Sequence, residues 1–131
     1  MGAWDLSGAP PMGDHMSENK LPYSVTRVHD GVIYVSGQLP RDPETGEMAE
    51  GIEAQTKVCL ENLARAVEQA GGSRASVLKV TVFLRDFADF GAMNAVYREF
   101  FAEPYPARSA FGVSGLVEGA LLEIEAVAAV E

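Results

Sequence analysis

One arginine and two glutamates near the end of the chain are the clearest candidates for chemistry. Arg108 lies in "EPYPARSAFGVSG", and Glu123 and Glu125 lie within the strand-like run "LLEIEAVAAV". Guanidinium groups pair with anions, and carboxylates act as acids or bases. Exposed Arg and Glu are common on protein surfaces, so by themselves these three side chains are more typical of solvated charges than of a site.

Other residue types that carry chemistry give weaker signals. Cys59 falls on an apolar helical stripe, which favours a buried small hydrophobe over a nucleophile. His15 and His29 are too few and too far apart to predict a zinc site. Ser36 and Ser109 have no histidine close in sequence to act as a base. The chain contains no nucleophile elbow, phosphate-binding loop or dinucleotide fingerprint, so these patterns predict no reaction.

The composition predicts one globular domain. The chain has 131 residues, of which 47% are hydrophobic and 22% charged, with a single cysteine. One cysteine excludes an intrachain disulfide. The formal net charge of −9 disfavours nucleic-acid binding, because phosphate backbones are repelled. We find no apolar run that could span a bilayer and no secretory leader, so we expect no membrane association and a cytoplasmic protein.

The elements that must position these residues follow from periodicity. Residues 23–40 predict a hairpin with Asp30-Gly31 at its turn. Apolar residues three or four apart predict a helix over 49–70, ended by Gly71-Gly72. Alternation over 76–86 predicts a strand, with its inner face formed by Leu78, Val80, Val82 and Leu84.

A second helix should follow Asp86 or Asp89, either of which could cap it. Its apolar stripe comprises Phe90, Met93, Val96 or Tyr97, and Phe100 or Phe101. Two strands, over 108–114 and 120–130, complete the order β-β-α-β-α-β-β. This order predicts an α+β fold with a mixed sheet and both helices on one face. The composition of residues 1–20 predicts a flexible N-terminal arm or a remnant of an expression tag. We expect residues 21–131 to form the domain.

In the last strand, Glu123 and Glu125 share one face, while Leu122 and Ile124 share the other. If the helices cover the apolar face, both acids lie on a face that is either solvated or part of an oligomer interface.

Three stretches resemble the Rid/YjgF family of enamine/imine deaminases. They are "PYSVTRVHDGVIYVSGQLPRDPETGEM", "VLKVTVFLRDFADFGAMNAVY" and "YPARSAFGVSGL…ALLEIEAVA", and the resemblance runs from about residue 21 to the C-terminus. It implies the chorismate-mutase-like fold and a homotrimer in which three sheets form a central barrel. Active sites would lie in clefts between subunits, and no metal or cofactor would be needed.

The resemblance also implies roles for individual residues. The family hydrolyses small 2-imino or enamino acids to 2-keto acids and ammonia. By position, Arg108 would bind the substrate carboxylate and Glu123 would activate water. Tyr23 and Ser36 would line the pocket, and Asn94 would support the pocket or the interface.

Two positions leave alternatives open. The best-known deaminases of the family carry cysteine where this chain has Ala110, and Glu125 is either a second functional acid or a structural partner. Ala110 therefore keeps two other hypotheses in view: a non-catalytic trimeric protein that binds small carboxylates, and a pathway-specific Rid-like deaminase or hydrolase with a larger substrate. A ribonuclease role, attached to some relatives, is disfavoured by the net charge of −9.

Overall fold

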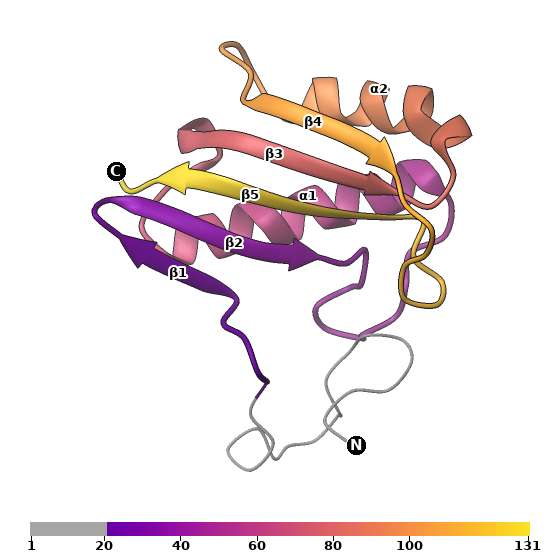
Figure 1. Ribbon diagram of the computed structural model, residues 1–131, viewed down its shortest axis with the longest axis horizontal. Helices are drawn as coiled ribbons and strands as arrows, with labels where there is room; N and C mark the ends of the chain where they lie inside the picture. Colours follow the sequence, from indigo (N-terminus) through magenta and orange to yellow (C-terminus); the bar gives the residue numbers. More distant parts are fainter. Residues whose placement is uncertain (1–20) are drawn as a thin grey trace.

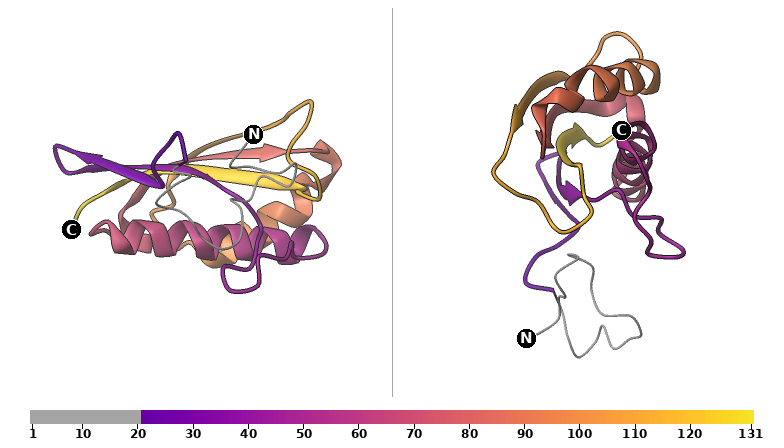
Figure 2. Two further views of the ribbon diagram at one scale, coloured as in Figure 1. Left: turned by 90° about the horizontal axis from the view of Figure 1, so that it is seen from below. Right: turned by 90° about the vertical axis from the view of Figure 1, so that its right-hand side faces the viewer.

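The computed structural model describes residues 21–131, in which one five-stranded sheet carries both long helices on a single face (Figures 1 and 2). The predicted N-terminal arm lies outside the described residues. The elements in chain order are β1 (Thr26–His29), β2 (Val32–Gln38), α1 (Ile52–Gln69), β3 (Val77–Leu84), α2 (Phe90–Phe100), β4 (Ala107–Gly112) and β5 (Leu122–Ala129). The predicted order β-β-α-β-α-β-β is confirmed.

The sheet is mixed, as predicted, with the spatial order β1-β2-β5-β3-β4. Only β3 and β4 run parallel, because α2 returns the chain between them; the other pairs are antiparallel. The hairpin turn is formed by Asp30 and Gly31, both with positive φ, which suits the right-handed twist of the flanking strands. β4 therefore lies at one edge of the sheet and β5 at its centre.

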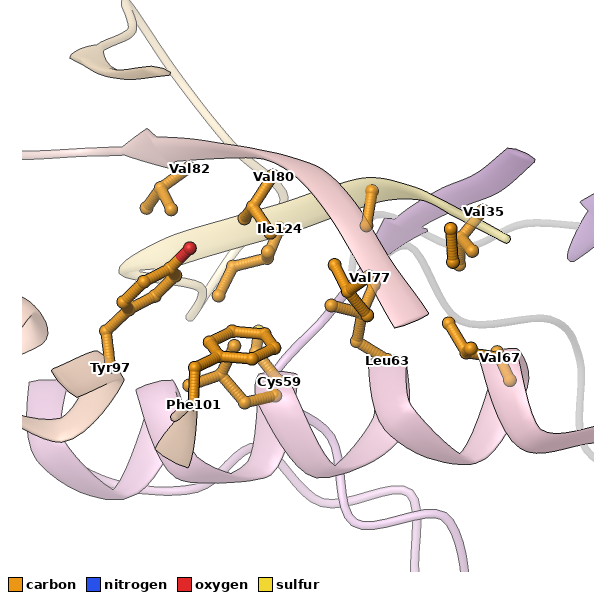
Figure 3. Close-up of a cluster of buried hydrophobic side chains, with 14 of the residues drawn as sticks. Val35, Cys59, Leu63, Val67, Val77, Val80, Val82, Tyr97, Phe101 and Ile124 are labelled. Atoms are coloured by element: carbon orange, nitrogen blue, oxygen red, sulfur yellow. The ribbon is translucent and has the colours of Figure 1, made fainter. Parts of the chain in front are cut away.

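The core lies between the sheet and the two helices (Figure 3). The predicted stripe on α1 is buried, with Cys59, Leu60, Leu63 and Val67 fully covered. The helix begins at Ile52 rather than near residue 49, because Gly51 has φ +88 and cannot join an α-helix. Met93, Tyr97 and Phe101 are the buried members of the second stripe. Within residues 21–131 no helix could cross a bilayer.

The predicted position of Leu78 is wrong. We expected it on the inner face of its strand, but it is 52% exposed, whereas Val77 is only 5% exposed. The pairing of β3 with β5 shifts register between Val77 and Lys79, so the strand contains one extra residue there. Such a β-bulge reverses the inward and outward alternation on one side of itself.

The single cysteine is expected to be unreactive in the native protein. Cys59 is fully buried, and its Sγ lies 3.3 Å from the carbonyl oxygen of Gln38. Burial, and secondarily the charge of Glu123, raise the thiol pKa well above its usual value. A disulfide reagent at neutral pH should therefore label no thiol until guanidinium chloride is added, and then one per chain. Rapid stoichiometric labelling of the native protein would contradict this.

Candidate functional site

Arg108 lies on the helix side of the edge strand β4. It pairs with the buried Val80 of β3, which places its side chain beside α2. Its Nη1 donates a hydrogen bond to Asn94 Oδ1 at 2.8 Å. Its guanidinium carbon lies 4.6 Å from the centre of the Tyr97 ring and 5.4 Å from that of Phe90. These contacts hold the guanidinium over the faces of two aromatic rings.

A cavity of about 330 Å³ opens at this guanidinium. It is lined by Asn94, Tyr97, Arg98, Tyr105, Pro106 and Arg108. Tyr97 and Arg98 follow Asn94 by three and four positions on α2, so each lies beside Asn94 on one flank of the helix. The described residues that line the cavity are cationic or neutral and include no carboxylate, which suits an anionic ligand.

Tyr97 is the floor of this cavity and was predicted only as an alternative core residue. It is 5% exposed, and its hydroxyl has no hydrogen-bond partner among the described residues. In Figure 3 its ring lies between α2 and the underside of β3. Burial raises the pKa of Tyr97 to about 12 although the charge of Arg108 lowers it, so the phenol stays neutral. The only signal in the sequence that could have placed Tyr97 at this cavity was its spacing of three residues from Asn94 on the predicted helix.

Glu123 lies on the opposite side of the sheet, on the face away from the helices, which we call the open face. It is half-buried and pairs with Phe83 of β3. Burial, and then repulsion from Glu125, raise the pKa of its carboxyl group. Burial is the main cause of the raised pKa of Tyr23, and the charge of Glu123 is the second, so the two side chains interact electrostatically. A carboxylate with a raised pKa is a better proton acceptor than an ordinary glutamate.

Tyr23, Ser36 and Glu125 line one cavity on the open face, of about 360 Å³. The Ser36 hydroxyl donates a hydrogen bond to the carbonyl oxygen of Ser24 at 2.6 Å. β2 shifts register against β5 between Val35 and Gln38, which brings this part of the strand beside the two glutamates. Two of the predicted site residues, Tyr23 and Ser36, thus share a cavity with Glu125, whose role the sequence left open.

Within one chain, the residues around Arg108 and the residues around Glu123 do not form a single site. Arg108 and Asn94 lie on the helix side of the sheet, whereas Glu123 and Tyr23 lie on the open side. Ala110 shares the helix side with Arg108 but packs against the hydrophobic core. It is not among the residues that line the Arg108 cavity, so the structure does not show a pocket widened at this position.

Gly37 makes room for the Glu123 carboxylate. A Cβ atom added to Gly37 would lie 2.0 Å from Glu123 Oε2, which is far inside van der Waals contact. Because that oxygen is the end of a flexible side chain, it can move aside. Gly37→Ala should therefore change the melting temperature little, yet displace the carboxylate.

If Glu123 acts in catalysis, Gly37→Ala should lower kcat roughly 10-fold or more while leaving KM nearly unchanged. Gly91→Ala is the matched control, because nothing lies within 4 Å of the added atom. Placing Gly37→Ala in a Glu123→Gln background should cause no further loss. A full additional loss there would show that Gly37 acts through another residue.

Within residues 21–131 no three His, Cys, Asp or Glu side chains are grouped as metal ligands would be. The groups that the described residues offer for chemistry are the Arg108 guanidinium, the Glu123 carboxylate and nearby hydroxyl groups.

The chain is similar to known proteins over most of its length. A family model described as endoribonuclease L-PSP matches residues 16–130. A RutC family protein of Pyrococcus abyssi is 49% identical over 108 residues, covering 82% of this chain and 85% of that protein. The human 2-iminobutanoate/2-iminopropanoate deaminase is 39% identical over 108 residues, covering 82% of this chain and 79% of that enzyme.

Solved structures share the fold. RidA from the Antarctic bacterium Psychrobacter superposes with a TM-score of 0.81 at 36% identity, covering 98% of both chains. E. coli TdcF, solved with bound serine, gives 0.80 at 33% identity, again covering 98% of both. With the family model, these matches show that the chain belongs to the endoribonuclease L-PSP family, which is also known as the Rid/YjgF family.

Proposed function

We propose that this protein hydrolyses reactive 2-imino or enamino acids to 2-keto acids and ammonia. The observation that carries the proposal is the Arg108 guanidinium, held by Asn94 and Tyr97 at a cavity whose described lining residues include no carboxylate. Such a group binds the carboxylate of a small acid through two parallel hydrogen bonds. The deaminases among the relatives support the same reaction.

In the proposed mechanism, Arg108 binds the substrate carboxylate and so fixes the adjacent imine carbon. Glu123 accepts a proton from water while the water oxygen bonds to that carbon and the C=N π electrons move to nitrogen. Glu123 then returns that proton to the nitrogen, which gives a neutral intermediate with one OH and one NH2 group on the same carbon. Glu123 next takes the OH proton and passes it to the NH2 group; the O–H electrons form the carbonyl of the keto acid, the C–N bond breaks, and neutral ammonia leaves. Tyr23 and Ser36 hydrogen-bond the substrate or the water.

The reaction needs a second copy of the chain, because Arg108 and Glu123 lie on opposite sides of one sheet. We propose a homotrimer whose open faces meet at the centre, so that each site combines Arg108 of one copy with Glu123 of the next. Large apolar side chains on the open face support burial there: Tyr34 and Phe111 are half exposed in the single chain. Phe111 packs edge-on against Phe83, beside the Glu123 position.

Deamination is favoured over the ribonuclease activity named in the family description. The net charge of −9 repels RNA, whereas a small acid needs only the local charge at Arg108. The serine bound in the TdcF structure supports a ligand of amino-acid size.

The direct test generates 2-iminopropanoate in situ with an amino-acid oxidase and traps free imine with semicarbazide. The protein should lower the trapped fraction, and Arg108→Ala should not. If the wild-type protein leaves the fraction unchanged yet binds small carboxylates through Arg108, a non-catalytic binding role replaces this proposal.

Mixing two inactive variants tests the site between copies. Arg108→Ala and Glu123→Gln, unfolded together in equal amounts and refolded, should regain activity, because some sites then receive both intact groups. A site is intact when one copy supplies Arg108 and its neighbour supplies Glu123. Random assembly gives a probability of ½ × ½, so about one quarter of wild-type activity should return. Sites formed within single copies would regain none.

A further inference from the structure

The cavity at Arg108 is lined by a second arginine, the exposed Arg98, which the proposed mechanism does not use. Arg98 follows Asn94 by four positions on α2 and therefore lies on the same flank of the helix, next to β4. The cavity volume of about 330 Å³ lies at the small end of the range for ligand sites. Two arginines thus line one space of small-molecule size.

The charge of Arg98 is not neutralised by the described part of the chain. Within residues 21–131 its guanidinium forms no ion pair or hydrogen bond, and no acid lines the cavity. This holds although the chain has 19 acidic and 10 basic residues. Arg98 also lies in the last turn of α2, where a positive charge interacts favourably with the helix dipole and stabilises the helix. That role explains a charge near the helix end but not its place in the Arg108 cavity.

The wall beside Arg98 is formed by the segment that leads into β4. The Tyr105 hydroxyl donates a hydrogen bond to the backbone carbonyl oxygen of Arg98 at 3.3 Å. Tyr105 and Pro106 both line the cavity, so this segment closes the space between the two arginines on one side. Two like charges beside one small cavity repel each other, and a ligand with two negative charges relieves that repulsion.

The geometry points to a substrate with two carboxylates, a 2-imino dicarboxylic acid. Arg108 binds the carboxylate next to the imine carbon, and Arg98 binds the carboxylate at the end of the side chain. This inference rests on the proposed function and narrows its substrate from 2-imino acids in general to the acidic ones.

The kinetic test compares 2-iminobutanedioate with 2-iminopropanoate, both generated in situ. The wild-type protein should favour the dicarboxylate in kcat/KM by about tenfold, the worth of one partly exposed charge-assisted contact. Arg98→Gln should reduce this ratio to about one. Lys57→Gln, which removes an equal charge from the exposed surface of α1, should keep the wild-type ratio. A ratio near one in the wild-type protein overturns the inference while leaving deamination intact.

A binding test separates this inference from the proposed reaction. Calorimetric titration with succinate and with butanoate measures affinity without turnover. Succinate should bind the wild-type protein about tenfold more tightly than butanoate, and Arg98→Gln should remove the advantage. Equal affinities, or an advantage that persists in Arg98→Gln, overturn the dicarboxylate assignment. If no imine is hydrolysed, deamination fails, and the titration alone decides whether the cavity binds dicarboxylates.

Discussion

Arg108→Ala should nearly eliminate hydrolysis of 2-imino acids, mainly through lost binding. The variant removes the charge and the paired hydrogen bonds that fix the substrate carboxylate. One such contact contributes about 1.5 to 3 kcal/mol, so KM should rise roughly 10- to 100-fold. A further loss in kcat is expected, because a loosely held substrate no longer presents its imine carbon to the water. Steady-state kinetics over a wide substrate range measures both effects.

Arg108→Lys is the informative companion variant. Lysine keeps the positive charge but cannot form two parallel hydrogen bonds or lie flat on the Tyr97 ring. We expect intermediate binding and a kcat well below that of the wild-type protein. Circular dichroism should show the same fold in both variants, since Arg108 is only partly buried at an edge strand. An unchanged KM in Arg108→Ala would show that another group binds the carboxylate.

Glu123→Gln should lower kcat roughly 10²- to 10⁴-fold with little change in KM. Glutamine has nearly the same shape but cannot accept the proton from water at neutral pH. The carboxylate of the substrate is bound elsewhere, by Arg108, so affinity should persist. Glu125→Asn is the comparison variant, because Glu125 lies on the same face of the sheet with an exposed side chain. An equal loss of kcat in Glu125→Asn would contradict the assignment of the base to Glu123 alone.

The raised pKa of Glu123 also predicts opposite effects on activity and on stability. Catalysis needs the ionised carboxylate, so activity should fall on acidification at a higher pH than for an ordinary glutamate. For stability, a carboxyl group whose pKa is raised by folding stabilises the fold when protonated. That contribution is lost as the pH rises through the raised pKa.

Glu123→Gln should therefore melt slightly higher than the wild-type protein at neutral pH, because it removes a half-buried charge beside Glu125. The difference should vanish as acid protonates Glu123. Thermal melts across pH give the sign directly. A variant that melts lower at neutral pH would show that ionised Glu123 stabilises the fold.

The elements were predictable because each rests on a local pattern. The hairpin depends on Asp30-Gly31, and the apolar stripe of α1 depends on spacing along one segment. Family resemblance then supplied the candidate site residues. The bulge that exposes Leu78 was not predictable, since it arises from the pairing of β3 with a strand more than 40 positions later.

The side of β4 on which Arg108 lies could not be predicted from the sequence either. In "ARSAFG", Phe111 is the large apolar residue and would be placed inward by alternation alone. It is half exposed on the open face, and Arg108 with Ala110 faces the helix side instead. The close approach of Gly37 to Glu123 is likewise a property of two distant segments. The candidate residues could be identified from short stretches of sequence, but which of them come together depends on how distant strands pair in the fold.

The central position of β5 has a consequence for how the chain is made. β5 follows the other four strands of the sheet in the chain, yet it joins β2 to β3 in the middle of the sheet. The β1–β2 hairpin and the β3–β4 pair therefore keep unpaired edges until β5 has been synthesised, and such edges invite aggregation. A chain that stopped before Leu122 would hold two sheet fragments without the strand that joins them.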